Sequence, residues 1–122
     1  MILDSTLLKL EAVLAAVIAT NQPEVHVDFI VWNTDGVPSK PQTFRTALNS
    51  NTDVTILAAP LTNGQVREPV GVSIFNKDTA NVTVTVKTDD GTTERIIIKR
   101  TIGADETLHY MKGIGWYREA VV

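Results

Sequence analysis

Two histidines and three acidic groups are the side chains of this sequence that could perform chemistry. His26 and His109 could act as general bases, while Asp78, Asp89-Asp90 and Asp105-Glu106 offer the carboxylate oxygens that Ca²⁺ prefers. However, neither histidine is spaced to meet a nucleophile or an orienting carboxylate. Each acidic group falls in a predicted turn, where aspartate hydrogen-bonds nearby backbone amides. We therefore expect these residues to be structural, and we predict no catalytic, cofactor-binding or metal-binding residue.

The motifs of common enzyme classes are missing from the sequence. It contains no Gly-rich phosphate loop, no G-x-S-x-G turn and no H-E-x-x-H helix. Because it also lacks cysteine, a disulfide framework, a thiolate zinc site and a cysteine nucleophile are excluded. We predict that the protein is not an enzyme and that it needs no cofactor.

The charge pattern argues against two classes of partner. The 122 residues include 11 basic and 14 acidic side chains, a net charge of −3, and Lys99-Arg100 is the only close basic pair. Nucleic-acid binders normally show a clustered basic surface, so we expect no nucleic-acid partner. The apolar stretch 7–18 is interrupted by Lys9 and Glu11. It is therefore unlike an export signal and too short and charged to span a bilayer. We expect a protein made in the cytoplasm, unprocessed and without a membrane partner.

Residues 1–22 show the pattern of an α-helix. Competent N-cap residues at positions 4–6 precede a run rich in Leu and Ala, and Pro23 stops the run. Apolar residues spaced 4, 3, 4 and 3 form an a/d seam over two heptads: Leu3, Leu7, Leu10, Leu14 and Val17. A helix this apolar must be covered. It could pack on the sheet of its own chain, or join a short bundle around a symmetry axis, which would make the protein a homotrimer.

Residues 23–122 are predicted to form one β-domain. The alternation of Val82, Val84 and Val86 with polar residues is typical of a half-buried strand, and the turn at 89–91 leads into another strand. Runs of this kind predict eight strands: Glu24–Trp32, Thr43–Leu48, Val54–Ala58, Pro69–Phe75, Val82–Thr88, Glu94–Arg100, Thr107–Met111 and Trp116–Glu119. We predict a mainly β fold, an antiparallel β-sandwich or a jelly-roll-like barrel of about eight short strands, preceded by one N-terminal helix.

Several residues outside the helical seam are predicted to contact a partner. Trp32 and Trp116 could lie on a surface that binds carbohydrate or protein, although Trp116 follows a glycine-rich turn and could equally pack on the edge of the sheet. Pro38 and Pro41 stiffen a loop after the first predicted strand. The apolar chain end Ala120-Val121-Val122 would need a cover. We expect the seam, this loop and the chain end to be the contact elements.

The second half of the chain resembles small virion proteins of tailed bacteriophages. The matching pieces are mostly turn and core positions: Val54-Thr55-Ile56-Leu57-Ala58-Ala59-Pro60, Val72-Ser73-Ile74-Phe75-Asn76-Lys77-Asp78-Thr79, Val82-Thr83-Val84, Asp90-Gly91-Thr92-Thr93, Asp105-Glu106-Thr107-Leu108-His109-Tyr110 and Gly113-Ile114-Gly115-Trp116. Such proteins are similar to head decoration (cement) proteins and to neck or tail components. The resemblance covers about half of the chain, implies a β-fold and a structural role, and brings no catalytic residue.

These observations lead to one expected function and two alternatives. We expect a structural virion protein, most specifically a decoration protein that binds the major capsid protein outside the shell. It would stabilise the capsid by burying surface that neither partner buries alone. A neck, tail or fibre component, with another virion protein as its partner, is the second expectation. A host-surface glycan-binding module, in which Trp32 or Trp116 stacks on a sugar, is the alternative from another class.

Overall fold

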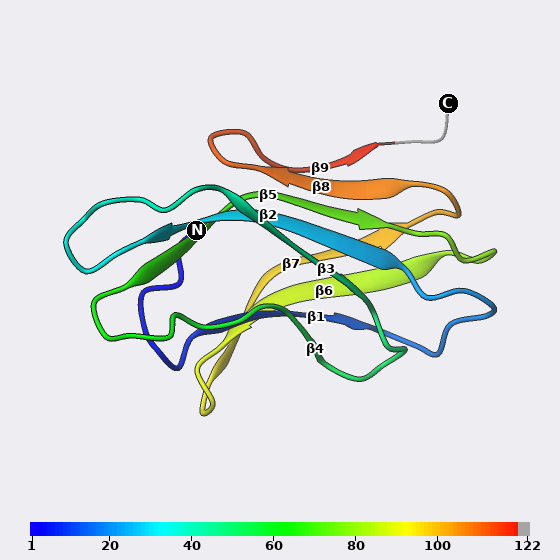
Figure 1. Cartoon of the computed structure of the whole chain (residues 1–122). Helices are drawn as coiled ribbons and strands as arrows, with labels where there is room; N and C mark the ends of the chain where they lie inside the picture. Colours follow the sequence, from blue (N-terminus) through cyan, green and yellow to red (C-terminus); the bar gives the residue numbers. More distant parts are fainter. Residues whose placement is uncertain (120–122) are drawn as a thin grey trace.

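The computed structural model describes residues 1–119, which form nine β-strands in two antiparallel sheets (Figure 1). The four-stranded sheet has the order β4 (Val54–Leu57), β1 (Lys9–Leu14), β6 (Val82–Asp89) and β7 (Glu94–Ile102). The five-stranded sheet has the order β3 (Gln42–Ala47), β2 (Glu24–Trp32), β5 (Val66–Phe75), β8 (Thr107–Met111) and β9 (Gly115–Glu119). The predicted mainly β fold is thus confirmed. The chain end 120–122, which we expected to be a contact element, lies outside the described residues.

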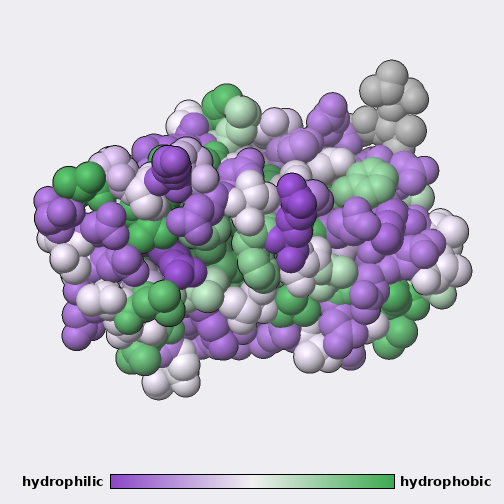
Figure 2. Space-filling model, viewed as in Figure 1, coloured by the Kyte–Doolittle hydropathy of each residue, from purple (hydrophilic) through white to green (hydrophobic). Residues whose placement is uncertain are grey.

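The two sheets form layers that share one hydrophobic core, with the five-stranded sheet above the four-stranded one in Figure 1. Alternate side chains of both sheets point into it, for example Val84 and Val86 of β6 and Val25 and Val27 of β2, all fully buried. Between residues 1 and 119, no strand of one sheet pairs along its length with a strand of the other. The arrangement is therefore sandwich-like. On the face shown in Figure 2, apolar residues lie in small groups among polar ones.

All eight strands predicted from the sequence are present, because alternation and turn residues are local signals. The turn between β6 and β7 contains Gly91 at φ +90°, a backbone conformation that favours glycine. The main deviation among these strands is the early start of β5, at Val66. Pro69 is accommodated there because the pairing of β5 with β2 is irregular at this point and β8 pairs with β5 only from Gly71 onward.

The predicted N-terminal helix is wrong. Between residues 1 and 119 the structure contains no helix, and so none that is long and apolar enough to cross a membrane. Residues 9–14 instead form β1, which lies between β4 and β6 and pairs with both. Leu10, Ala12 and Leu14 are buried at alternate positions, so the apolar run also contains the period of a strand. Because β1 hydrogen-bonds to a strand on each side, residues 9–14 adopt the two-residue period of a strand and not the period of a helix.

The residues of the predicted helical seam are separated in the structure. Leu10 and Leu14 point into the core from β1, and Leu3 is buried where it forms an isolated bridge with Arg67 of β5. Leu7 and Val17 lie outside the strand and are 68% and 74% exposed. No seam is left to form a helical bundle. The expectation of a homotrimer built on this seam therefore has no basis in these residues.

Candidate functional site

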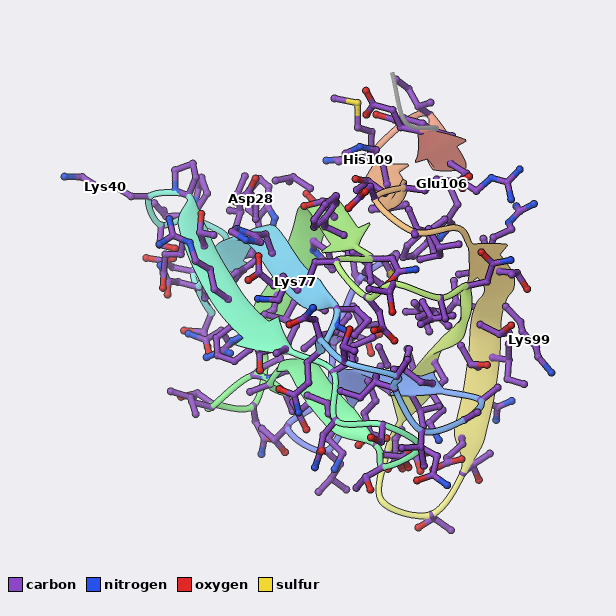
Figure 3. The ribbon with its side chains drawn as sticks, turned by 90° about the vertical axis from the view of Figure 1, so that its right-hand side faces the viewer. Asp28, Lys40, Lys77, Lys99, Glu106 and His109 are labelled. Carbon is purple, nitrogen blue, oxygen red and sulfur yellow. The ribbon has the colours of Figure 1, made fainter. Side chains whose placement is uncertain are left out.

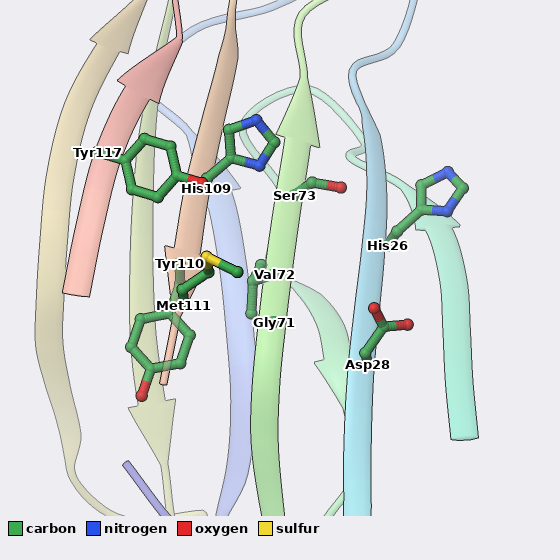
Figure 4. Close-up of a pocket in the computed structure, with 9 residues that line it drawn as sticks. All are labelled: His26, Asp28, Gly71, Val72, Ser73, His109, Tyr110, Met111 and Tyr117. Carbon is green, nitrogen blue, oxygen red and sulfur yellow. The ribbon is translucent and has the colours of Figure 1, made fainter. Parts of the chain in front are cut away.

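A row of polar and aromatic side chains crosses the outer face of the five-stranded sheet. Pairing places one residue of each strand opposite the next, in the order Arg45, His26, Ser73, His109 and Tyr117. Figure 4 shows both imidazole rings on this face with the side chain of Ser73 between them. Two strand spacings, about 10 Å, separate the backbones of the two histidines. The sequence placed them on different strands but could not show that these strands share a neighbour.

The four members of this row from His26 to Tyr117 line an open hollow of about 320 Å³. Nε2 of His109 lies 2.7 Å from a carboxylate oxygen of Glu119, and its ring stacks on Tyr117 with centroids 5.1 Å apart. In the described part of the chain, neither histidine is hydrogen-bonded to Ser73. A serine nucleophile needs such a contact with its base. The hollow therefore offers a surface of mixed polarity for contact, and neither histidine activates Ser73.

The acidic groups considered as calcium ligands form turns, as the sequence predicts. Asp90 accepts hydrogen bonds from the backbone amides of Thr93 and Thr92 at 2.7 and 2.9 Å, and these bonds lower its pKa. Asp89 accepts one from the amide of Gly91 at 2.7 Å. Asp105 lies in the turn before β8, at φ +61°. Asp89 and Asp90 therefore act as hydrogen-bond acceptors that stabilise the turn between β6 and β7.

Asn76 and Asp78 form a buried polar cluster at the end of the molecule where β5 leads into β6, on the right in Figure 1. The side-chain amide of Asn76 donates to the carbonyls of Ala80, Ile102 and Gly103 at 2.9–3.1 Å. Its side-chain oxygen accepts from the amide of Asp78. Because Asn76 directly follows β5 and Ile102 is the last residue of β7, these bonds join the two sheets.

The carboxylate of Asp78 holds the loop between β1 and β2. It accepts hydrogen bonds from the backbone amides of Ala19, Thr20 and Asn21 at 2.8–3.1 Å, and from the hydroxyl of Thr20. The amide of Thr79 is a further donor. Donors from Ala19, Asn21 and Thr20 favour the ionised form and hold the pKa of Asp78 far below its usual range. Sequence analysis assigned Asp78 to a turn but missed this long-range role.

A second polar cluster lies on the outer face of the four-stranded sheet, around Lys87. Its ammonium lies 2.9 Å from Glu94 and 3.0 Å from Asp53. Burial opposes the charged form of Lys87, but the hydrogen bonds to these two carboxylates outweigh it and raise its pKa. Oxygens of Glu11, Asp53 and Glu94 lie within 4.8 Å of one another, which would suit a cation. Lys87 already supplies a positive charge at this place.

Glu11 is the least satisfied member of this cluster. Its side chain is 5% exposed, and one oxygen lies 3.3 Å from the ammonium of Lys9. The other oxygen is buried and has no hydrogen-bond partner. Burial raises the pKa of Glu11, against the lowering effect of Lys9. Sequence analysis did not identify this site, because Glu11 is the single acidic residue of the apolar run 7–18.

The structure places the predicted contact residues in different regions. Trp116 packs on Tyr110, with ring centroids 5.2 Å apart, and both contact the core. Trp32 is half-buried at the end of β2 and forms a bridge with Pro38, which is exposed like Pro41. The two tryptophans therefore do not form one platform. Of the helical seam, only Leu7 and Val17 remain accessible to a partner.

An open sheet edge is the exposed feature that sequence analysis missed. β7 forms one margin of the four-stranded sheet and pairs with β6 alone. Its residues 94–97 and 99–101 are exposed, including Ile96 at 67% and Ile97 at 37%. The sequence identified 96–98 as an apolar strand, but only the strand order shows that it lies at an edge.

No family model, curated protein or solved structure matches this chain.

Proposed function

We propose that this protein is a structural component that binds other proteins, specifically a head decoration (cement) protein of a tailed bacteriophage. The observation that carries the proposal is how the molecule uses its polar side chains. Asn76, Asp78 and Lys87 hold the scaffold together. On β7, by contrast, Ile96 and Ile97 are exposed, and the basic residues 95, 99 and 100 form no salt bridge within residues 1–119. A rigid scaffold with an open edge suits binding to protein.

The resemblance to small phage virion proteins supplies the specific form of the proposal. It rests on residues 54–116, which run from β4 to the start of β9 and include the buried polar cluster of Asn76 and Asp78. In this role the protein would reside in the virion and bind the major capsid protein. Copies would stabilise the shell by bridging subunits and burying apolar surface between them.

Imaging of intact particles tests this function. Particles would be purified from cultures that produce the phage carrying this gene, and the protein identified by mass spectrometry and antibody labelling. We expect regular density for it on the outer shell. Particles stripped of the protein should release DNA at a lower temperature, and adding the protein back should restore their stability. Density confined to the neck or tail would instead support the neck, tail or fibre alternative.

The glycan-binding alternative receives less support from the arrangement of the tryptophans. Trp116 is engaged with Tyr110 and the core, so it would have to leave this packing to stack on a sugar. Trp32 is the tryptophan that could serve. Specific binding on a glycan array, abolished by Trp32→Ala and retained by Trp116→Ala, would favour this alternative over the structural role.

A further inference from the structure

The open edge of β7 combines apolar and basic residues. Ile96–Ile98 form the centre of the strand, with Arg95 before them and Lys99 and Arg100 after them. In Figure 3 the label Lys99 marks a side chain that projects from β7 away from the molecule. In the part of the chain that the structure describes, these three basic residues form no salt bridge, whereas Lys9, Lys77, Lys87, Lys112 and Arg118 each do.

One end of this edge is closed by the chain itself. The guanidinium of Arg118, on β9, donates to the backbone carbonyl of Thr101 at 3.2 Å. The rest of the strand, residues 94–100, pairs with β6 on one side only. An unpaired edge presents backbone amides and carbonyls to a further strand. The accessible stretch is therefore a basic and apolar strand with its backbone free on one side.

We propose that the edge of β7 binds an extended acidic segment of a partner protein, which adds to the four-stranded sheet as a fifth strand. The inference rests on the proposed function, since it names the surface through which such a structural protein binds. Backbone hydrogen bonds provide affinity in this mode, and side chains provide selectivity. The matching segment has a short centre of β-branched residues opposite Ile96–Ile98, flanked on both sides by Asp or Glu. These acidic side chains pair with Arg95, Lys99 and Arg100.

A second copy of β7 is a poor occupant of the full length of this edge, because the pairing with β6 divides β7 into two faces and limits the registers that a copy can take. Residues opposite the outward side chains of β6 face outward, and those opposite its valines face the core side. The outward residues are Glu94, Ile96, Lys99 and Thr101, and the core-side residues are Arg95, Ile98, Arg100 and Ile102.

A twofold-related copy must match outward with outward residues. The longest register that does so uses residues 94–101 and places Arg95 opposite Arg100, twice, and Ile96 opposite Lys99. A shorter register over residues 94–99 places Glu94 opposite Lys99 instead, and the test for a dimer below addresses it. Like charges directly opposite each other destabilise a strand pair. The register of β7 against β6 also shifts between Val86 and Lys87, a local irregularity of the kind that discourages unspecific edge pairing. In its longest register the edge thus disfavours its own copy, and it accepts a strand of opposite charge.

A peptide titration of the full chain tests the inference. The probe is a synthetic peptide with a Val-Thr-Val-Thr centre and two glutamates on each side, labelled for fluorescence anisotropy. A second peptide has lysine in place of each glutamate. We expect the acidic peptide to bind, with an affinity that falls as salt is added, and the basic peptide not to bind. In NMR spectra of the native protein, the amides of β7 should shift and become protected from exchange.

Two matched double variants locate the site. Lys99→Glu/Arg100→Glu reverses two exposed charges of β7. Lys40→Glu/Arg45→Glu reverses two exposed charges on β3, an edge strand of the five-stranded sheet, and in the loop before it. We expect the first variant to weaken binding at least about 10-fold and the second to change it less than about 2-fold. Equal losses in both variants would overturn the inference. So would shifts centred on another strand, or no shift of β7 amides at about 2 mM peptide.

The same variants separate this inference from the proposed function. If Lys99→Glu/Arg100→Glu still decorates particles as the native protein does, the β7 inference fails and the decoration role stands. If native protein is absent from particles but binds the acidic peptide through β7, the decoration role fails and the binding edge stands. Native protein that associates through β7–β7 contacts, shown by protection of β7 amides in a dimer, would overturn the choice of partner.

Discussion

At the scale of single residues, the buried polar side chains connect distant parts of the chain. Asn76 links the ends of β5 and β7, and Asp78 collects backbone amides from the loop after β1. A buried carboxylate is tolerated when it accepts several hydrogen bonds, and losing them leaves backbone amides unsatisfied. Glu11 is the opposite case, a buried carboxylate with one unpartnered oxygen. The two residues therefore predict opposite dependences of stability on pH.

Asp78→Asn should destabilise the protein at neutral pH. The neutral amide is a weaker acceptor, and one of its two side-chain atoms cannot accept hydrogen bonds at all. We expect the melting temperature at pH 7 to fall by at least about 5 °C. Because the pKa of Asp78 is lowered by folding, its contribution is complete well above 3.8 and is lost as the pH falls below that value. The difference between native protein and variant should therefore shrink in melts at pH 3 and below.

Asp35→Asn is the matched control for this change. Asp35 is an exposed turn residue whose carboxylate accepts one hydrogen bond, from the amide of Val37 at 3.0 Å. We expect this variant to melt within about 2 °C of the native protein. Equal losses in the two variants would contradict the special role assigned to Asp78.

Glu11→Gln should stabilise the protein at pH 7, by about 0.5–1 kcal/mol in the free energy of unfolding. Folding raises the pKa of Glu11, so the ionised side chain costs stability at pH values above its folded pKa. That cost disappears as the pH falls to the ordinary value of 4.5 and the carboxyl binds a proton. The advantage of the variant should therefore be largest at pH 7 and vanish near pH 4.5 in urea unfolding.

Glu24→Gln provides the comparison for Glu11→Gln. Glu24 is paired with Lys77 at 2.7 Å, and this pair lowers its pKa. Removing its charge should leave stability unchanged or slightly reduced, since surface pairs contribute little. A gain of the same size in both variants would show that overall charge, rather than the burial of Glu11, is responsible.

At the scale of elements, β1 shows how pairing overrides local preference. Its sequence favours a helix by composition, yet residues 9–14 lie between two strands that hydrogen-bond it on both sides. Helical propensities differ by less than about 1 kcal/mol per residue between ordinary side chains, so a strand that completes a core can outweigh them. β7 is the opposite case, because it pairs with a strand on one side only and its other side is unpaired.

Substitutions at four of the five seam positions distinguish strand from helix. Leu10→Ala and Leu14→Ala remove buried side chains from β1 and should each cost about 2–4 kcal/mol in the free energy of unfolding. Leu7→Asp and Val17→Asp alter exposed side chains and should change it by less than about 0.5 kcal/mol. Chemical unfolding measures all four. A helix packed through this seam would instead lose stability in every variant, so large losses at Leu7 and Val17 would contradict the structure.

At the scale of the whole molecule, charge is unevenly placed. The chain has a net charge of −3, but β7 contributes three basic residues and one acidic residue to an exposed edge. Such an edge attracts acidic surfaces, and its longest self-pairing register places like charges opposite each other. We therefore infer that copies of this chain assemble only when each of them binds to the surface of a partner.

The free protein should be a monomer. We expect light scattering at micromolar concentration to give a mass near 13.3 kDa at both low and moderate salt. Neutralising the repulsion in Arg95→Gln/Arg100→Gln should increase self-association, because the isoleucine edge then lacks like charges opposite each other. A native dimer or trimer that persists on dilution would contradict the monomer. An unchanged monomer in the variant would show that charge repulsion is not what prevents pairing.

Much of the candidate site was beyond sequence reasoning for one physical reason. The row from Arg45 to Tyr117 joins residues of five strands, and its order depends on which strands pair. The same holds for Lys87 and its carboxylates, which come from residues 53, 87 and 94. A sequence pattern shows on which face of a strand a side chain lies, but not which strand lies beside it. Motif searches therefore could not assemble either group.

By itself the sequence determined the eight strands from Glu24 onward and the turns between them. These depend on alternation over a few residues and on Gly, Asn and Asp at the turns. The tertiary structure alone decided that residues 9–14 are a strand, because their apolar spacing fits both a helix and a sheet. It also decided that β7 lies at an open edge. Strand order comes from contacts between distant segments, and their free energy depends on burial in the assembled core.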